Sequence, residues 1–401
     1  MAVYRWNSFI QFLCEVYQTP APDRQALADE LLASPGGFPW VERNKATFVF
    51  DSPSAQQVAL NIDIVNRDPP FEPMVRLDDT NLWYFQRHFE RDALVDYMFA
   101  VDDPGTPLAQ ELDLMQRVGR HWQADPLNAQ SIQAQSVGTS ILQMPRARPV
   151  PNWRAMGGVP RGRIARYRFN STQLNFSQRS LWVYTPPDYD AAETKNYRLL
   201  IFLDGQWAIN ALEAPYIVDA LIKHRRMQPI IIAMLSSGSQ SERLQEYIGN
   251  DKHYAMLAAE LLPFLQAEHR IQPLELGLGG VGEGAVAAAH AALKNPAIFE
   301  RLIMVSPPLG SRAAVHLLKE TAERFRDLPI LPNRIFHSVG RYEHDMRYVQ
   351  PALALRGILE RRMLHDPSLA YRFVELGSGH SLAAFKSVLP EALAHAFPPE
   401  S

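Results

Sequence analysis

A short glycine-rich segment carries the pattern in this chain that is most suggestive of chemistry. Gly280-Val281-Gly282-Glu283-Gly284 follows an apolar stretch and precedes a run of alanines that favours a helix. A strand, a sharp glycine turn and a helix form the layout of a nucleophile elbow, whose pattern is G-x-S-x-G. The middle position here is Gly282, so the attacking hydroxyl is missing. On its own, the segment also fits a tight strand-to-helix connection or a phosphate-binding loop.

Three further segments lie where the same chemistry needs them. Nucleophilic acyl transfer on such a scaffold uses, in chain order, an oxyanion loop, the elbow, an acid and a histidine. Leu203–Trp207 follows an apolar strand, and its Gly205 lets backbone N–H groups approach a substrate oxygen. Glu343 and Asp345 follow a later strand, and His380 lies on a glycine-rich loop after the last one. From the residues alone, either acid fits, and His380 also fits a structural loop histidine.

Strands and helices alternate in the second half of the chain. Apolar strands are predicted at 179–185, 197–203, 229–235, 302–305 and 334–339, and an amphipathic helix at 254–266. Continuous apolar strands separated by amphipathic helices predict a mostly parallel sheet covered on both faces. Active sites of such sheets lie at the carboxyl ends of the strands, where all four segments fall.

The first part of the chain has a different pattern. Apolar positions recur at helical spacing between residues 6 and 33. Short strands separated by turn residues are predicted at 47–50, 58–64, 82–85 and 94–101. The sequence therefore predicts a helical segment at 1–45, a small β-sandwich at 46–142, a Pro- and Arg-rich connection at 143–162 and an α/β domain at 163–401.

Composition argues against several classes of protein. A formal net charge of -3 gives no electrostatic reason to expect nucleic acid or a membrane surface as a partner. Cys14 is the only cysteine, so we expect no internal disulfide, and no cluster implies a metal or an organic cofactor. No apolar run is long enough to cross a bilayer, and the start lacks the core of a signal peptide. We expect a cytoplasmic protein with a small-molecule ligand; the sequence is silent on its oligomeric state.

The same segments resemble the enterochelin (enterobactin) esterase family, bacterial iron-siderophore esterases within the esterase D-like α/β-hydrolases. The most specific match is Leu203–Trp207, which is similar to the family's LDGQ-W signature. Arg243 lies in a segment similar to R-x-x-E-L, Gly340–Glu343 resembles the acid loop, and Gly379–His380 resembles the histidine loop. The resemblance extends to the front half, at 74–84, 97–99 and 125–128, which look like the family's N-terminal immunoglobulin-like domain.

This resemblance implies an α/β-hydrolase preceded by an immunoglobulin-like β-sandwich, acting on carboxylic esters such as a siderophore-type lactone. It implies that Glu343 is the acid and His380 the general base. The backbone N–H groups of Gln206 and Glu283 would form the oxyanion hole. The residues it places against the substrate are Gly205, Trp207 and Arg243.

Two elbow residues depart from the family pattern G-Q-S-F-G-G. Gly282 has no side chain and cannot form an acyl-enzyme. Glu283 replaces an apolar residue and puts a carboxylate beside the pocket, which disfavours an anionic catecholate. Natural loss and laboratory replacement of the serine both fit, and the unusual neighbours Val281 and Glu283 favour natural loss. Other serines near strand ends, outside the elbow, are Ser236, Ser237, Ser306 and Ser381.

We therefore expect an esterase architecture that is inactive or impaired in this chain. One alternative is a pseudo-esterase with a ligand-binding or regulatory role. The other is a hydrolase in which Glu283 and His380 activate water directly, without a serine.

Overall fold

The computed structural model describes residues 4–65, 67–134, 137–190, 194–310 and 315–400. These residues divide into two compact units. The first comprises Met1–Pro149 and Gly377–Ala384, and the second comprises Val150–Leu376 and Phe385–Ser401. The sequence predicts one continuous domain at 163–401, whereas the structure assigns Gly377–Ala384 to the first unit.

Close backbone packing explains this assignment. The Leu94 N–H donates to the Gly377 carbonyl oxygen at 2.9 Å. A Cβ atom at Gly379 would lie 2.2 Å from the carbonyl oxygen of Asp63, so this loop approaches the first unit at a distance that only glycine allows.

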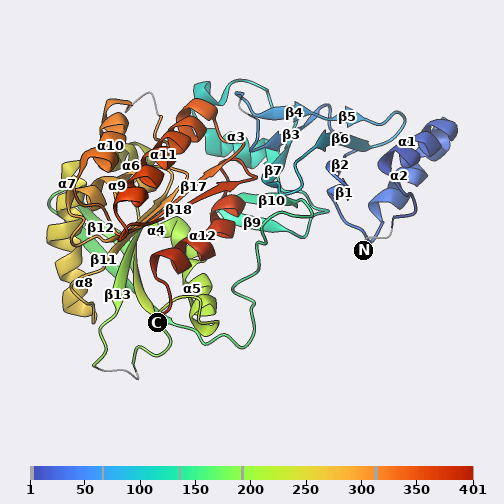
Figure 1. The fold of residues 1–401 in the computed structure, drawn as a ribbon. Helices are drawn as coiled ribbons and strands as arrows, with labels where there is room; N and C mark the ends of the chain where they lie inside the picture. Colours follow the sequence, from blue (N-terminus) through green and yellow to red (C-terminus); the bar gives the residue numbers. More distant parts are fainter. Residues whose placement is uncertain (1–3, 66, 135–136, 191–193, 311–314, 401) are drawn as a thin grey trace. The chain divides into compact units, whose positions relative to one another are not determined.

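The strands in the described part of the first unit form two antiparallel sheets (Figure 1). Helices α1 (Phe9–Gln18) and α2 (Arg24–Leu32) precede them, and α3 (Leu114–His121) follows β7. One sheet has the order β1 (Trp40–Glu42), β2 (Lys45–Asp51), β6 (Leu82–His88), β5 (Val75–Arg76). The other has the order β4 (Phe71–Pro73), β3 (Val58–Ile62), β7 (Leu94–Val101), β10 (Val137–Gln143), β9 (Ser131–Ala134), with β8 (Trp122–Gln123) paired to β7.

Aromatic side chains from the two sheets fill the space between them. The rings of Phe48 on β2 and Tyr97 on β7 lie 4.8 Å apart, and both side chains are buried. Helix α1 begins after Ser8, whose hydroxyl caps the Gln11 N–H. Its apolar face joins the cluster that contains Trp40 of β1. The first unit is therefore a β-sandwich that also packs against its N-terminal helices.

The strands predicted at 47–50, 58–64, 82–85 and 94–101 are confirmed as β2, β3, β6 and β7. Strands β9 and β10 lie in a region where the sequence showed little periodicity. Ser140 of β10 is fully buried, and its hydroxyl accepts the Asp125 N–H at 2.8 Å. A polar residue that is buried because it is hydrogen-bonded breaks the alternation by which a strand is recognised.

Among the described residues of the second unit, eight strands form one sheet in the order β11-β12-β14-β13-β15-β16-β17-β18. Strand β12 is antiparallel to both neighbours, and every other adjacent pair is parallel. The strands are β11 (Arg163–Ser171), β12 (Phe176–Thr185), β13 (Arg198–Leu203), β14 (Ile230–Leu235), β15 (Gly277–Val281), β16 (Arg301–Val305), β17 (Arg334–Gly340) and β18 (Ala370–Leu376). All five predicted strands are confirmed, and the sheet is mostly parallel as expected.

Helices cover both faces of this sheet. Helix α9 (Glu283–Lys294) contacts α6 (Gln240–Tyr247), α7 (Asp251–Ala255) and α10 (Val315–Asp327) on one face. Figure 1 shows α5 (Ala214–Lys223) and α12 (Leu382–Ala396) on the other. The remaining helices are α4 (Gly205–Asn210), α8 (Leu262–Glu268) and α11 (Gln350–His365). A π-helical turn at Met256–Leu261 joins α7 to α8, so the predicted helix 254–266 belongs to a longer helical segment.

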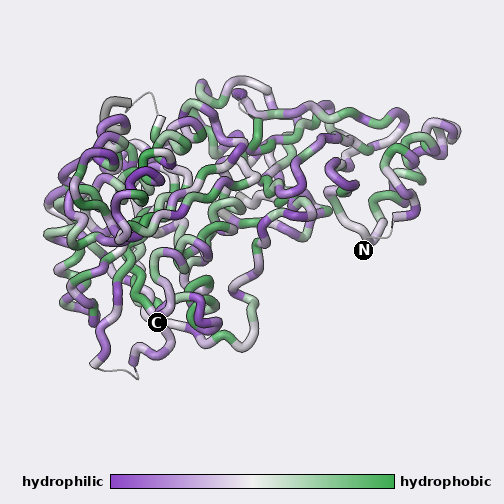
Figure 2. The backbone as a smooth tube through the Cα atoms, in the orientation of Figure 1, coloured by the Kyte–Doolittle hydropathy of each residue, from purple (hydrophilic) through white to green (hydrophobic). Residues whose placement is uncertain are grey.

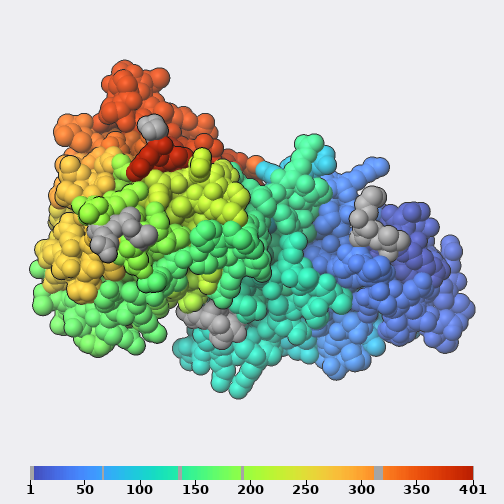
Figure 3. All heavy atoms as spheres, turned by 90° about the horizontal axis from the view of Figure 1, so that it is seen from below, coloured from blue at the N-terminus to red at the C-terminus, as the bar shows by residue number. Residues whose placement is uncertain are grey.

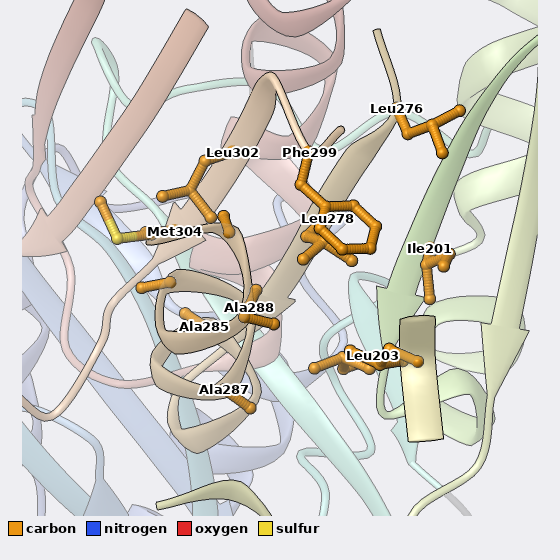
Figure 4. Packing of buried hydrophobic residues seen from close by; sticks show 14 of the residues in the cluster. Ile201, Leu203, Leu276, Leu278, Ala285, Ala287, Ala288, Phe299, Leu302 and Met304 are labelled. Carbon is orange, nitrogen blue, oxygen red and sulfur yellow. The ribbon is translucent and has the colours of Figure 1, made fainter. Parts of the chain in front are cut away.

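The hydrophobic core of the second unit lies around the central strands of its sheet. Strands β13 and β14 consist almost entirely of hydrophobic residues, which are green in Figure 2. Figure 4 shows small side chains of α9 beside Leu278, Leu302 and Met304 of the sheet. Alanines on this helix face let it pack closely against the strands.

The C-terminal residues close the opposite face. The Gln228 N–H donates to the Phe397 carbonyl oxygen at 3.2 Å. Figure 3 shows the red C-terminal atoms beside the yellow-green atoms of the segment that includes α5. Within the described ranges, no helix combines the length and the apolar character needed to cross a membrane.

Candidate active site

The elbow turn between β15 and α9 has a backbone conformation that suits glycine. Gly282 has φ 56° and ψ -127°, and α9 begins at the next residue. Side-chain-bearing residues adopt such a positive φ only with strain, which nucleophile elbows carry at their serine. The Gly282 N–H donates to the Val305 carbonyl oxygen at 2.9 Å and fixes the turn against β16. The strained turn is therefore present, and the residue at its apex has no side chain.

The two flanking glycines allow strand and helix to meet closely. A Cβ at Gly280 would lie 2.4 Å from the Gly284 carbonyl carbon. A Cβ at Gly284 would lie 2.8 Å from Oδ2 of Asp204. The elbow thus packs against both its own helix and the loop after β13, at distances that exclude larger residues.

The loop after β13 leads directly into α4. Asp204 adopts a left-handed conformation with φ 59°, and α4 begins at Gly205. A Cβ at Gly205 would lie 2.4 Å from the Met234 carbonyl oxygen, so this helix start is pressed against the end of β14. The Gln206 side chain donates to Ser237 Oγ at 2.7 Å and accepts the Ser237 N–H at 3.1 Å. Its backbone N–H lies in the first helical turn, where N–H groups lack intrahelical partners.

A buried charge cluster joins this loop to the elbow. Arg243 of α6 donates through Nε and Nη2 to the two carboxylate oxygens of Asp204, at 2.8 and 2.6 Å. Its Nη1 donates to Oε2 of Glu283 at 2.6 Å. Arg347 donates through Nη2 to the other oxygen of Glu283 at 2.9 Å. The Arg243 guanidinium also lies 5.0 Å from the ring centre of Trp207.

Electrostatic interactions favour the charged forms of Glu283 and Arg243. Burial acts to raise the pKa of Glu283, but Arg243 and Arg347 outweigh it and hold the pKa below its ordinary value. The carboxylate also accepts a hydrogen bond from the backbone N–H of Glu283 itself. Burial acts to lower the pKa of Arg243, but Asp204 and Glu283 raise it above its ordinary value.

The two candidate acids on the loop after β17, Glu343 and Asp345, differ in their burial. Glu343 is only 3% exposed, and its N–H donates to the Gly340 carbonyl oxygen at 3.1 Å. Asp345 is exposed, opens a π-helical turn and accepts a hydrogen bond from Gln350 at 3.1 Å. The two acids therefore differ in environment, with Glu343 buried and Asp345 in contact with solvent.

His380 belongs to the first unit and its side chain is exposed. The residues that follow it are held by Asp96 of β7, whose carboxylate accepts the Ala383 N–H at 3.4 Å. Burial raises the pKa of Asp96 to about 6, although hydrogen bonds from Ala383 and Ser381 oppose the change. Asp96 therefore accepts from residues directly after the histidine loop, within the same unit.

The second unit thus brings Gly282, Glu283 and Arg243 together, and ties the acid loop to them through Arg347. Sequence reasoning missed two members of the cluster, Asp204 and Arg347. Asp204 gave one signal, since an aspartate before a glycine after a strand tolerates a left-handed backbone. Arg347 gave no signal in the sequence, because its partner Glu283 lies 64 positions away.

The fold and the arrangement of strand-end loops define an α/β-hydrolase with a β-rich N-terminal unit. A family model described as "putative esterase" matches residues 171–396, and one described as "enterochelin esterase, N-terminal" matches residues 41–153. The chain belongs to this esterase family and is of its enterochelin-esterase-like type.

Solved structures agree on the fold. The ferric enterobactin esterase from Salmonella typhimurium superposes with a TM-score of 0.72 at 21% identity, covering 88% of this chain and 93% of that one. The enterobactin esterase from Shigella flexneri, solved in the presence of enterobactin, gives 0.69 at 19% identity, covering 88% and 92%. No curated protein matches the sequence.

Proposed function

We propose that this chain keeps the ester-binding frame of an enterochelin-esterase-like hydrolase but cannot form an acyl-enzyme at its elbow. The observation that carries the proposal is Gly282, which holds the strained turn at φ 56° and has no side chain to attack a carbonyl. Without a nucleophile, only the oxyanion donors and binding contribute, which leaves roughly 10³- to 10⁴-fold over water in well-studied triads.

The other groups keep the roles that the family resemblance gives them. In the proposal, Glu343 orients His380, which acts as the general base. The N–H groups of Gln206 and Glu283 would stabilise the oxyanion, and both lie at helix starts. The substrate class is a carboxylic ester, with a siderophore-type lactone as one candidate, because the Shigella flexneri relative was solved with enterobactin present.

Hydrolysis of p-nitrophenyl acetate and butyrate tests the proposal. Four proteins are compared side by side: the chain itself, its His380→Ala variant, Gly282→Ser, and Gly282→Ser with His380→Ala. Circular dichroism confirms that each is folded. We expect activity only in Gly282→Ser, since that change restores the one missing hydroxyl. Activity of the unmodified chain that is lost with His380→Ala would show that Gly282 is not disabling.

A binding protein without turnover is the second candidate. Glu283 favours it, because both carboxylate oxygens are engaged by Arg243 and Arg347 beside the elbow. A folded but inactive Gly282→Ser variant would support this candidate. The same ion pairs argue against Glu283 as a general base for water, since its lowered pKa makes it a weaker base.

A further inference from the structure

We propose that Glu283 is a built-in anion that occupies a two-arginine site at the elbow and thereby restricts the ligand to uncharged esters. This inference rests on the proposed function and narrows its ligand class.

The contacts of Glu283 are those of a bound carboxylate. Arg243 and Arg347 approach from different elements, α6 and the loop after β17, and each donates to a different oxygen. Two guanidinium groups that converge on one carboxylate form a strong, charge-assisted arrangement. The carboxylate also lies at the start of α9, where the helix dipole favours negative charge. Apart from its covalent tether, Glu283 therefore occupies an anion site.

Charge balance shows what this occupancy does. Asp204 and Glu283 supply two negative charges, and Arg243 and Arg347 supply two positive ones. The side chains of Asp204, Arg243 and Glu283 are 2%, 4% and 12% exposed, whereas that of Arg347 is 43% exposed. An incoming anion would meet a neutral cluster whose inner arginine, Arg243, already donates through all three of its nitrogens.

Competition by a tethered group explains the selectivity. A group held beside its site acts at an effective concentration in the millimolar range or above. A free carboxylate must displace Glu283 and leave that charge without its arginines, which is costly in a buried place. An uncharged ester needs no such displacement, so the cluster does not oppose its binding.

Removal of the Glu283 charge should open the site. In Glu283→Gln, Arg243 keeps its two hydrogen bonds to Asp204, and the amide oxygen still accepts from one of the two arginines. The donor of the other arginine becomes available, and the cluster gains one net positive charge. We expect Glu283→Gln to bind benzoate at least about 10-fold more tightly than the unmodified chain, measured by isothermal titration calorimetry. Binding of uncharged methyl benzoate should change by less than about 3-fold.

Two controls distinguish an effect of the two-arginine site from an effect of the protein's net charge. Glu360→Gln removes an exposed carboxylate that pairs with Arg356 at 2.6 Å, and it should leave benzoate binding as in the unmodified chain. Adding Arg347→Gln to Glu283→Gln should abolish the gain, because one of the two arginines is then missing. Should Glu283→Gln fold poorly, Glu283→Ala replaces it, since alanine is a strong helix former in the first turn of α9.

Equal benzoate affinity in the unmodified chain and the folded Glu283 variants would overturn the inference, as would a gain that survives Arg347→Gln. Benzoate binding involves no acyl transfer, so these results leave the proposed loss of the nucleophile untouched. Conversely, His380-dependent hydrolysis by the unmodified chain would contradict the proposed function without bearing on Glu283.

Discussion

At the scale of single residues, a buried charge cluster of Asp204, Arg243, Glu283 and Arg347 surrounds the start of α9. Arg243 was expected to contact the substrate, but the structure buries it between Asp204 and Glu283. Glu283 was expected to contribute its backbone N–H, and its carboxylate proves to be the centre of a charge cluster. Side-chain partners 39 and 40 positions away cannot be predicted from local patterns, because they depend on how three separate loops meet.

Arg243 should be the most sensitive charged residue of this cluster. Arg243→Ala leaves the buried carboxylates of Asp204 and Glu283 without their shared partner, which we expect to cost about 3 to 5 kcal/mol of unfolding free energy. Urea denaturation, monitored by circular dichroism, measures this change in unfolding free energy. Arg326→Ala is the matched control, since its partner Asp327 and Arg326 itself are exposed, and it should leave the denaturation midpoint unchanged. Equal midpoints for the two variants would contradict the cluster's structural role.

At position 282, we expect any residue with a side chain to be less stable than glycine, because of the positive φ. Its φ of 56° predicts that Gly282→Ala costs about 1 to 3 kcal/mol of unfolding free energy. Gly357 in α11 offers a control of opposite sign. Outside the helix's own backbone, the one described atom within 4 Å of an added Cβ is Nη1 of Arg361, at 3.6 Å. Gly357→Ala should stabilise the protein by about 0.5 to 1 kcal/mol. Gly282→Ala that is as stable as the unmodified chain would show that the turn is relaxed.

At the scale of helices and strands, hydrophobic periodicity was a sound guide where one face or both faces are apolar. Strands such as β13 and β14 are continuous apolar runs and were predicted within a residue or two of their observed bounds. Strand β11 was missed, since arginines recur along it, as at Arg163, Arg166 and Arg168, and much of it is exposed. Edge strands carry such charges because only part of their surface is buried.

The start of α12 should respond to pH through Asp96. Burial raises the pKa of this carboxyl to about 6, from 3.8. Because the folded state then holds its proton more tightly, the stability that Asp96 contributes is full below about pH 4 and is lost as pH rises to about 6. Relative to Asp96→Asn, the unmodified chain should lose about 2 to 3 kcal/mol of unfolding free energy between pH 4 and pH 7.

Urea unfolding of both proteins at a series of pH values measures this difference. Hydrogen exchange at the Leu382 and Ala383 amides locates it, since both donate to Asp96. A stability difference that stays constant from pH 4 to pH 7 would show that Asp96 titrates at its ordinary pKa.

At the scale of the whole molecule, the division into units was the least predictable feature. Composition and strand pattern gave an N-terminal β-sandwich and a C-terminal α/β-hydrolase, but they placed the histidine loop in the latter. The structure assigns Gly377–Ala384 to the first unit, in which Asp96 holds Ala383 across 287 positions of sequence. Such long-range packing leaves no periodic signal, since it rests on glycines and one buried carboxylate. The histidine loop is thus held by contacts within the first unit.

Reaction with a fluorophosphonate ester, followed by intact-mass and peptide mass spectrometry, tests the central claim most directly. Such a reagent phosphonylates a serine, with loss of fluoride and the hydroxyl proton, only where an activated hydroxyl meets an oxyanion site. We predict no adduct on the unmodified chain and a single adduct on residue 282 of Gly282→Ser. An adduct on the unmodified chain, at Ser306 or at any other serine, would contradict the account and identify the nucleophile that replaces the missing one.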